Sequence, residues 1–368
     1  MARALQLAEK WRGRTAPNPI VGCVIVDKRG AVIAEGAHRG PGAKHAERDA
    51  LEKLGGKAPG ATMYVTLEPC MHSGRTPPCV PAVKASGVAR VVVGTEDPIP
   101  GHGGGIEALR RAKISVTRAL VAACDASNRP FLTWSQYRRP AFTLKAAITL
   151  DGKIATVKGR SKWITGDAAR ADVHRLRDTH DAVLVGIRTV LADDPWLTAR
   201  LRGARDPMRI VLDGKLRTPL DARLLPKQGG PRTIIVTTDQ APAAKERALV
   251  KAGAEVWRFK ARANGHVPLD LLVQELGAKD ITSVLVEGGG QVHASFIDRR
   301  YADELVLYIA PKVVGGPAPS WVGGKGVGTI PAAAGFVLEG PPVQLGDDLR
   351  LRFTQAPDTR IDDPPPDD

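Results

Sequence analysis

The chain has 368 residues, 43% of them hydrophobic and 25% charged, so we expect a globular protein that divides into two domains. Its net charge is +14, but the basic residues are scattered and aromatic residues make up only 4%, which leaves few stacking platforms for nucleic acid. No apolar run is long enough to span a membrane, and four cysteines are too few for a disulfide scaffold. We therefore expect a cytoplasmic protein that binds neither membrane nor nucleic acid.

The first hundred residues alternate between strand and helix patterns. A helix over residues 2–11 precedes two apolar strand segments, which a turn at Lys28-Arg29-Gly30 joins. This alternation predicts an α/β sheet with helices packed on it. The remaining predicted elements are strands at 19–27, 30–39, 61–67 and 89–94 and helices at 45–55 and 77–87.

The pattern breaks at SNRPFLTWSQYRRP (127–140), which we interpret as the boundary between a domain of residues 1–138 and one of residues 139–355. Most strands of the second series are apolar throughout, as expected where helices cover both faces of a sheet. The last residues, 356–368, are acidic and rich in proline and are predicted to form a disordered tail. The second series comprises strands at 141–152, 181–186, 208–213, 232–238, 254–259, 281–290 and 302–311 and helices at 166–180 and 291–300.

One histidine and two cysteines form a candidate metal site. His45 opens a predicted helix, Cys70 and Cys79 flank a proline-rich loop, and Cys79 starts the next helix. Two thiolates and an imidazole suit zinc, and three protein ligands leave a fourth position for a water whose pKa zinc lowers toward neutrality. Glu47 lies two residues from His45, where a carboxylate can pass a proton to a leaving amine. The plain alternative is a surface histidine and two buried free cysteines.

The order HAE, EPC and a further cysteine is that of zinc nucleobase deaminases, although eight residues separate the two cysteines here in place of C-x-x-C. Together with APNPIVGCVIV, VTLEPC, GRTPPC and EDPIP, it resembles the deaminase half of the bifunctional riboflavin-biosynthesis deaminase/reductases. LKAAITLDGKIAT, SKWIT, VLADDPWLTARL, LVEGGG and YIAPKVVGG resemble the reductase half. The resemblance implies a cytidine-deaminase-like three-layer domain followed by a dihydrofolate-reductase-like α/β domain.

This resemblance implies an enzyme that is both a zinc hydrolase and an NADPH-dependent oxidoreductase. The first domain would use zinc hydroxide to deaminate 2,5-diamino-6-(ribosylamino)-4-pyrimidinone 5'-phosphate, and the second would reduce the ribosyl group to ribityl. The zinc ligands of the family fall on His45, Cys70 and Cys79, and its proton shuttle falls on Glu47. Its substrate contacts in this domain fall on Asn18, His38, His72 and Arg75.

In the second half, VEGGG (286–290) places glycines between a strand and a helix, whose N-terminal N–H groups can bind phosphate. No G-x-G-x-x-G fingerprint is present, so NADPH is implied by the resemblance and not by the glycines. The resemblance makes Lys145 a catalytic group facing the sugar; from residue type alone, it could point to solvent and Trp163 could be core. NADPH contacts fall on Ala147, Trp163, Thr189, Asp193, Gly289 and Gly290, and substrate contacts on Ser161, Arg177, Leu197, Arg200 and Glu287.

The chain departs from the family pattern just after the second cysteine-bearing motif. Ile99 stands where asparagine is usual, and GHGGG follows DPIP in place of V-x-G-x-G. Isoleucine cannot hydrogen-bond to a sugar or phosphate oxygen, so a reductase with an impaired deaminase domain is one alternative function. A nucleic-acid deaminase and a non-enzymatic zinc-stabilised module are two others. The resemblance also predicts a homodimer formed through the reductase domain.

Overall fold

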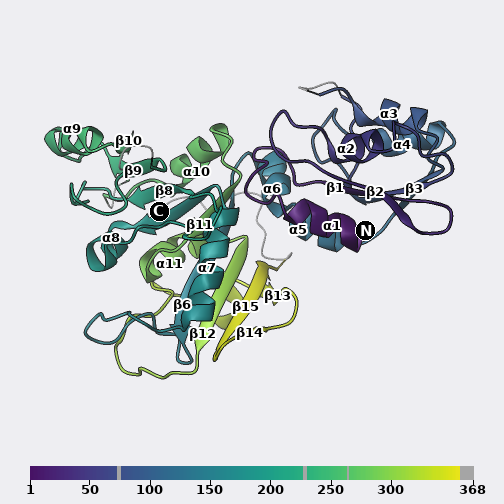
Figure 1. The fold of residues 1–368 in the computed structure, drawn as a ribbon. Coiled ribbons are helices and arrows are strands. Elements are labelled where there is room, and N and C mark those ends of the chain that lie inside the picture. Colours follow the sequence, from purple (N-terminus) through teal and green to yellow (C-terminus); the bar gives the residue numbers. More distant parts are fainter. Residues whose placement is uncertain (73–75, 227–229, 263–264, 357–368) are drawn as a thin grey trace. The chain divides into compact units, whose positions relative to one another are not determined.

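The computed structural model describes residues 1–72, 76–226, 230–262 and 265–356 (Figure 1). The chain divides into two compact units, the first of residues 1–139 with 277–282 and the second of the remainder. Arg75 and residues 357–368 of the predicted tail lie outside the described residues. Within the described residues, no helix combines the length and the apolar character needed to cross a membrane.

The first unit is built around a five-stranded sheet. The sheet has the order β2-β1-β3-β4-β5; β1 pairs antiparallel with β2 and β3, and β3, β4 and β5 run parallel. The elements are α1 (Ala2–Glu9), β1 (Gly22–Val26), β2 (Val32–Ala37), α2 (Ala46–Glu52), β3 (Thr62–Leu67), α3 (Cys79–Ala85), β4 (Arg90–Thr95), α4 (Gly105–Arg111), β5 (Ser115–Arg118), α5 (Val121–Ser127) and α6 (Arg129–Tyr137).

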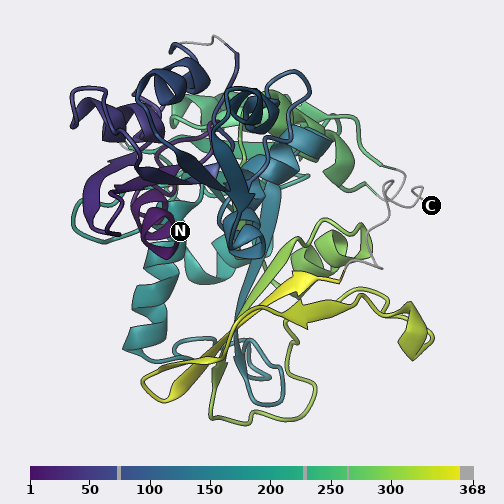
Figure 2. The ribbon, with the colours of Figure 1, turned by 90° about the vertical axis from the view of Figure 1, so that its right-hand side faces the viewer.

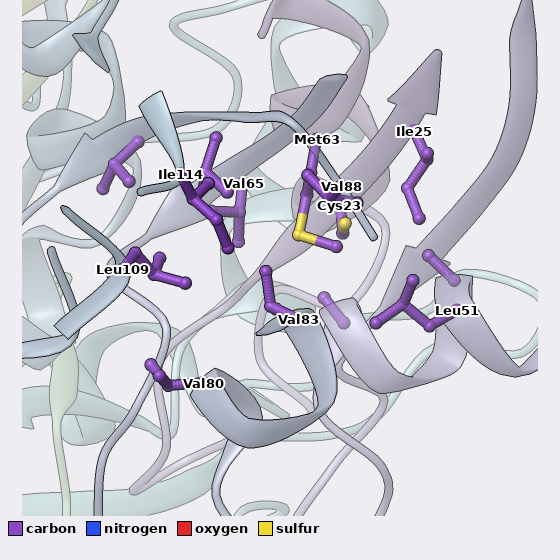
Figure 3. Close-up of a cluster of buried hydrophobic side chains, with 14 of the residues drawn as sticks. Cys23, Ile25, Leu51, Met63, Val65, Val80, Val83, Val88, Leu109 and Ile114 are labelled. Atoms are coloured by element: carbon purple, nitrogen blue, oxygen red, sulfur yellow. The ribbon is translucent and has the colours of Figure 1, made fainter. Parts of the chain in front are cut away.

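Helices cover both faces of this sheet, with α1 and α5 on one side and α2, α3 and α4 on the other (Figure 1). The alternation of side chains along β1 explains why. Cys23 and Ile25 point into the cluster formed with α2, α3 and α4 (Figure 3), whereas Val24 packs on the opposite face in the cluster that includes residues of α1. The predicted three-layer α/β arrangement is therefore confirmed.

The segment 127–140, which the sequence pattern presents as a break, contains helix α6. Pro130 occupies the first turn of this helix, where the missing N–H has no partner to lose. Phe131 is buried in the core of the first unit. The sequence analysis did not predict this helix, because a proline that starts a helix resembles one that ends a helix.

The second unit is built on a ten-stranded sheet of order β10-β9-β8-β7-β11-β6-β12-β15-β13, with β14 paired to β15. Its elements are β6 (Ala141–Thr149), α7 (Asp167–Thr179), β7 (Ala182–Gly186), α8 (Ile187–Asp193), β8 (Met208–Leu212), β9 (Thr233–Thr238), α9 (Ala243–Lys251), β10 (Glu255–Phe259), α10 (Leu269–Ala278), β11 (Ser283–Val286), α11 (Gly290–Asp298), β12 (Glu304–Ala310), η1 (Ile330–Ala332), β13 (Phe336–Leu338), β14 (Val343–Leu345) and β15 (Asp348–Gln355).

In sheet order, the strands from β10 to β12 run parallel. Most of them are apolar because both of their faces are buried, whereas the edge strand β10 is only half-buried. β7, for example, is buried at every residue. Among the described residues of this sheet, antiparallel pairing joins β15 to β12, β13 and β14 at one edge, where Figure 2 shows β13, β14 and β15 in yellow-green and yellow. The predicted α/β class of the second domain is confirmed, and these three edge strands are additions that the sequence did not reveal.

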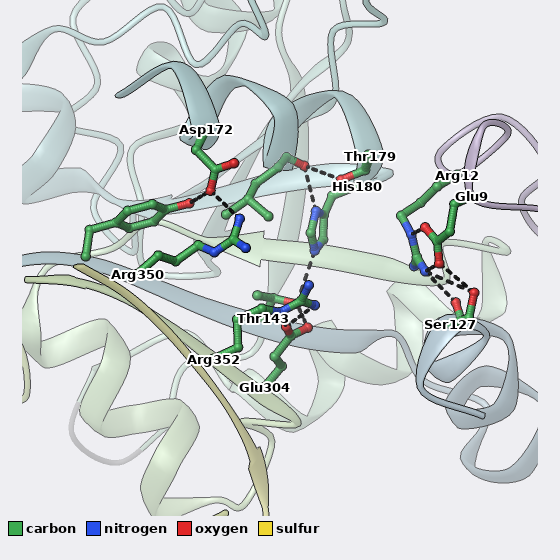
Figure 4. A network of polar contacts seen from close by, with 12 residues as sticks. Glu9, Arg12, Ser127, Thr143, Asp172, Thr179, His180, Glu304, Arg350 and Arg352 are labelled. Atoms are coloured by element: carbon green, nitrogen blue, oxygen red, sulfur yellow. Dashed lines mark hydrogen bonds and ion pairs between the residues drawn. The ribbon is translucent and has the colours of Figure 1, made fainter. Parts of the chain in front are cut away.

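Helix α7 is held to the sheet of the second unit by both charge and packing. Asp167 in its first turn and Arg177 in its last turn complement the helix dipole. Asp172 is buried and accepts hydrogen bonds from the Tyr308 hydroxyl (2.8 Å) and from Nη1 of Arg350 (2.8 Å), as Figure 4 shows. Since buried polar groups need partners, these bonds fix α7 against β12 and β15.

Candidate active sites

Three potential zinc ligands meet at the ends of three elements of the first unit. His45 is the N-cap residue of α2, Cys70 follows β3, and Cys79 is the first residue of α3. Nδ1 of His45 lies 3.4 Å from Sγ of Cys70 and 3.3 Å from Sγ of Cys79. One donor atom from each residue lies within 4.8 Å of the other two.

The electrostatics of the two thiols favour cation binding. A hydrogen bond from the Cys79 thiol lowers the pKa of Cys70 to about 4, and the same bond raises the pKa of Cys79. Both sulfurs are buried and in no disulfide, so their shared proton can be displaced by a metal ion. An imidazole nitrogen with two thiolates at this spacing fits tetrahedral zinc with one position left for water.

Glu47 lies on the first turn of α2 with its side chain buried. Burial raises its pKa to about 7, and its carboxyl group hydrogen-bonds with the Cys79 thiol. A carboxyl group that titrates near neutral pH can both accept and return a proton under cellular conditions. The structure therefore brings a proton carrier directly beside the three potential ligands.

One predicted substrate contact, His38, lies beside His45 and is itself in contact with a second, Asn18. Nδ2 of Asn18 is 3.1 Å from Nε2 of His38, and Nδ1 of His38 is 3.2 Å from the carbonyl oxygen of Lys44. The His38 ring stands edge-on to the His45 ring, with 5.6 Å between centroids. Burial lowers the pKa of His38, so its ring is neutral at neutral pH.

A third predicted contact, His72, has a neighbour that the sequence did not single out. Its ring stacks on that of His102 with 3.7 Å between centroids. Nδ1 of His72 is buried and has no hydrogen-bond partner in the described part of the chain, which leaves it available to a ligand. The predicted contact Arg75 lies outside the described residues.

Sequence reasoning also missed Glu68, two residues before Cys70. Its buried carboxylate accepts hydrogen bonds from the backbone N–H groups of Asp97 (3.1 Å), Gly104 (3.0 Å) and Ile106 (2.9 Å). Glu68 thereby ties the loop that carries Ile99 to the segment that carries Cys70. Ile99 itself packs against the apolar core of the unit, which accounts for an apolar residue at this position.

In the second unit, Lys145, Arg177 and Glu287 form a cluster of charged side chains with little exposure to solvent. Arg177 donates from Nε to Oε1 (2.6 Å) and from Nη2 to Oε2 (2.9 Å) of Glu287, and Nζ of Lys145 lies 3.5 Å from Oε2. Burial alone would raise the pKa of Glu287, but Arg177 and Lys145 lower it to about 2. Burial lowers the pKa of Lys145. Two cations against one carboxylate leave the cluster with a net positive charge.

Thr198, a residue that sequence reasoning missed, connects two of the predicted substrate contacts. Its carbonyl oxygen accepts from Nη1 of Arg177 (3.1 Å), and its hydroxyl accepts from Nε of Arg200 (3.3 Å). Two guanidinium groups are therefore held near each other, as phosphate binding requires. The side chain of the neighbouring Leu197 is buried in an apolar cluster, so a ligand could reach only its main chain.

The predicted NADPH contact Asp193 is hydrogen-bonded to Ser161, which is a predicted substrate contact. Ser161 donates from Oγ to Oδ1 of Asp193 at 3.3 Å, which joins the loop before α7 to the last residue of α8. Trp163 is not a core residue, because its side chain is 64% exposed, with the Arg170 guanidinium 4.4 Å from the ring centroid. Ala147 and Thr189 are half-buried.

The glycine loop after β11 leads directly into α11. A side chain at Gly289, the N-cap residue, would meet no atom within 4 Å. At Gly290 a Cβ atom would lie only 2.5 Å from the carbonyl oxygen of Ser320, so only glycine fits there. The open space beside Gly289 could admit a phosphate at the start of α11, whereas the backbone of residues 320–323 lies directly against Gly290.

Two family models match the chain: the cytidine and deoxycytidylate deaminase zinc-binding region over residues 1–95, and the RibD C-terminal domain over residues 140–346. The chain is 43% identical over 356 residues to the riboflavin biosynthesis protein RibD of Actinobacillus pleuropneumoniae, covering 96% of this chain and 94% of that protein. The chain belongs to the RibD family. The RibD protein of Escherichia coli is 39% identical over 90% of each chain.

Solved structures of RibD proteins share the whole architecture. The Thermotoga maritima diaminohydroxyphosphoribosylaminopyrimidine deaminase/5-amino-6-(5-phosphoribosylamino)uracil reductase superposes with a TM-score of 0.83 at 36% identity, over 97% of both chains. Acinetobacter baumannii RibD gives the same score and identity over 96% of this chain and 97% of that chain.

Membership of the RibD family defines the activity. The chain is a bifunctional riboflavin-pathway enzyme, with a zinc-dependent deaminase domain and a reductase domain that uses NADPH. A phosphorylated pyrimidine fits such an enzyme as substrate. The predicted family, fold, activity and cofactors are thus confirmed, and no comparison favours an impaired deaminase or a nucleic-acid deaminase.

Proposed function

We propose that residues 1–138 carry out the deamination and residues 139–355 the subsequent reduction. The cluster of His45, Cys70 and Cys79 supports the first assignment, since its donor set suits zinc. The charged cluster of Lys145, Arg177 and Glu287 supports the second assignment. In this cluster Glu287 pairs with both Lys145 and Arg177, which fixes the position of the lysine.

In the deaminase reaction, His45, Cys70 and Cys79 would hold zinc, which when bound would supply an activated water as the nucleophile. Glu47 would accept a proton from this water as the water oxygen adds to the pyrimidine carbon that bears the exocyclic amine. Glu47 would then deliver the proton to the amine nitrogen, so that the carbon–nitrogen bond breaks and ammonia leaves. Its pKa of about 7 supports both transfers.

Among the proposed substrate contacts of this domain, His38 lies beside the potential zinc ligand His45. Asn18 would hydrogen-bond to the base, and its amide is already oriented by His38. His38, His72 and Arg75 would contact the phosphoribosyl group, for which an unpartnered imidazole nitrogen on His72 is available. Histidine and arginine donors suit phosphate oxygens, which supports this assignment.

In the reductase reaction, NADPH when bound supplies the hydride. Lys145 would hydrogen-bond to the sugar oxygen at the carbon that accepts it and stabilise the charge that develops there. Glu287 holds Lys145 in place, and Arg177 and Arg200 would bind the phosphate. Ser161 and Leu197 complete the substrate contacts. The NADPH contacts would be Ala147, Trp163, Thr189, Asp193, Gly289 and Gly290.

The observation that carries this proposal is the buried carboxyl group of Glu47 beside three potential zinc ligands. The test is mass spectrometry of the products after zinc-replete protein meets the diaminopyrimidine ribosyl phosphate and NADPH. We expect the deaminated product with a ribityl side chain. If the substrate returns unchanged while the deaminated intermediate is reduced, the chain is a reductase with an impaired deaminase domain.

We further propose that the protein is a cytoplasmic homodimer that pairs through the reductase domain. The apolar residues Val337 and Leu338 are exposed on β13, and exposed apolar strands at a sheet edge favour pairing. The four cysteines are free, which suits a reducing compartment. Light scattering after size exclusion should give twice the mass of the chain; the mass of one chain would contradict the dimer.

A further inference from the structure

The potential zinc ligand His45 makes a contact on each of its two ring nitrogens. Nδ1 faces the sulfur atoms of Cys70 and Cys79, whereas Nε2 lies 2.9 Å from Oγ1 of Thr76. No other hydrogen-bond partner of Nε2 exists in the described part of the chain. The threonine hydroxyl is therefore placed where it can control the nitrogen that does not face the thiols.

We propose that Thr76 is a positioning residue that orients the potential zinc ligand His45. Its hydroxyl accepts a hydrogen bond from Nε2–H of His45 and so holds the ring with an unprotonated Nδ1 facing the thiols. A neutral imidazole carries one proton, so holding it on Nε2 leaves Nδ1 as the donor atom. Partners of this kind orient metal-binding histidines, and their removal weakens metal affinity about 10–100-fold. The proposal rests on the zinc ligands assigned under the proposed function and adds the residue that orients one of them.

The backbone around Thr76 holds the hydroxyl in place. Pro77 and Pro78 follow directly, and their rings restrict the backbone between Thr76 and Cys79. The carbonyl oxygen of Pro78 accepts a hydrogen bond of 3.0 Å from Nη2 of Arg48, which lies on α2. Since His45 is the N-cap residue of that helix, α2 and the 76–79 segment are joined at two points. One short segment thus supplies both a ligand, Cys79, and the hydroxyl that orients another.

Ring packing alone does not set this orientation. His38 stands edge-on to His45 with 5.6 Å between centroids, which restricts the tilt of the ring but offers no acceptor to Nε2. Rotation of the His45 ring by 180° about its Cβ–Cγ bond would leave the ring plane, and so its edge-on arrangement with His38, unchanged. The rotation would, however, turn Nδ1 away from the sulfur atoms. The hydrogen bond to Thr76 distinguishes the two ring orientations.

Two substitutions of Thr76 distinguish the effect of the hydroxyl from that of the size of the side chain. Thr76→Val replaces the hydroxyl by a methyl group, and Thr76→Ser keeps it. We expect zinc affinity, measured by competition with a chromophoric chelator, to fall about 10–100-fold in Thr76→Val and to stay near the parent value in Thr76→Ser. Thr95→Val is the matched control, because Thr95 donates to Asp125 (2.7 Å) in the same unit without contacting a potential ligand.

A second measurement, the visible spectrum of the cobalt-substituted protein, tests the role of Thr76 in folded protein and without an activity assay. The visible absorption of the cobalt-substituted protein reports ligand geometry, so Thr76→Val should shift its bands and Thr76→Ser should not. NADPH-dependent reduction of the deaminated intermediate should be unchanged in every variant, since it uses the other unit. Equal zinc affinity in Thr76→Val and the parent, or equal weakening in Thr76→Ser, would overturn the proposal.

The same titration distinguishes this inference from the proposed function. If the parent binds no zinc, or Cys70→Ser binds it as tightly as the parent, the ligand assignment itself is wrong. If the parent binds zinc through Cys70 but Thr76→Val binds it equally well, only the role of Thr76 is wrong.

Discussion

The burial of Glu47 raises the pKa of its carboxyl group to about 7, which suits it to transfer protons near neutral pH. Replacing Glu47 by glutamine keeps the shape of the side chain and removes the group that accepts the proton. We expect Glu47→Gln to lower ammonia release by at least about 100-fold, in line with the loss of general acid–base catalysis. Zinc content and NADPH-dependent reduction of the deaminated intermediate should be unchanged. Coupled assays of ammonia and of NADPH oxidation measure both reactions on one preparation.

Glu52→Gln provides the control for this prediction. Glu52 lies on the same helix, is exposed, and pairs with Lys44 at the surface, so its loss should leave both reactions unchanged. An equal fall of reduction in Glu47→Gln would show that the two reactions are not divided between the two units.

Ile99 is one position at which the chain differs from the motif expected of its family, and its packing against the apolar core accounts for an apolar residue there. Because it lies against the apolar core, Ile99→Asn would place an amide among apolar side chains. We expect the free energy of unfolding to fall by about 1–2 kcal/mol, without a gain in kcat/KM for deamination. Urea unfolding and ammonia release measure the two quantities. A tenfold gain in kcat/KM would instead mean that isoleucine had impaired this domain.

At the scale of the element, the cluster of Lys145, Arg177 and Glu287 joins β6, α7 and the end of β11. The pKa of Glu287 falls from its usual 4.5 to about 2 in the folded protein. A lowered folded-state pKa stabilises the protein above the unfolded pKa, and the stabilisation is lost as pH falls from about 5 toward 2. The shift corresponds to about 3 kcal/mol.

We therefore expect the second unit to lose stability between pH 5 and pH 2, with Glu287 as one cause. Thermal unfolding followed across this range should show a shallower pH dependence in Glu287→Gln than in the parent. Glu246→Gln is the control, since Glu246 pairs with Arg258 at a more exposed position in the same unit. Parallel pH dependences for the parent and Glu287→Gln would contradict the assignment.

At the scale of the whole molecule, the two units should respond separately to the removal of zinc. A ligand that binds only the folded state stabilises the unit that holds it, so a chelator should lower the unfolding temperature of the first unit alone. Ammonia release should stop, and reduction of the supplied intermediate should continue. Calorimetry with and without chelator checks the first point. Loss of reduction upon chelation would contradict independent units.

Much of this molecule follows from local patterns in the sequence. Short apolar segments predict most strands of the two sheets. The residues at or near the ends of the predicted elements include His45, Glu47, Cys70 and Cys79. Helix α6 was missed because Pro130 in its first turn resembles a helix end. Strands β13 and β14 were missed because three-residue strands carry too little periodicity to recognise.

The sequence by itself determined the family, the two α/β domains and the residue types of the zinc site, because these depend on short-range order and on motifs. Only the tertiary structure determines which polar side chains that are distant in the sequence form hydrogen bonds with one another. Thr76 reaches His45 across 31 residues, and Arg177 reaches Glu287 across 110. Contacts at such separations depend on how helices pack on a sheet and not on any local pattern. The ring orientation of His45 and the low pKa of Glu287 follow from packing for this reason.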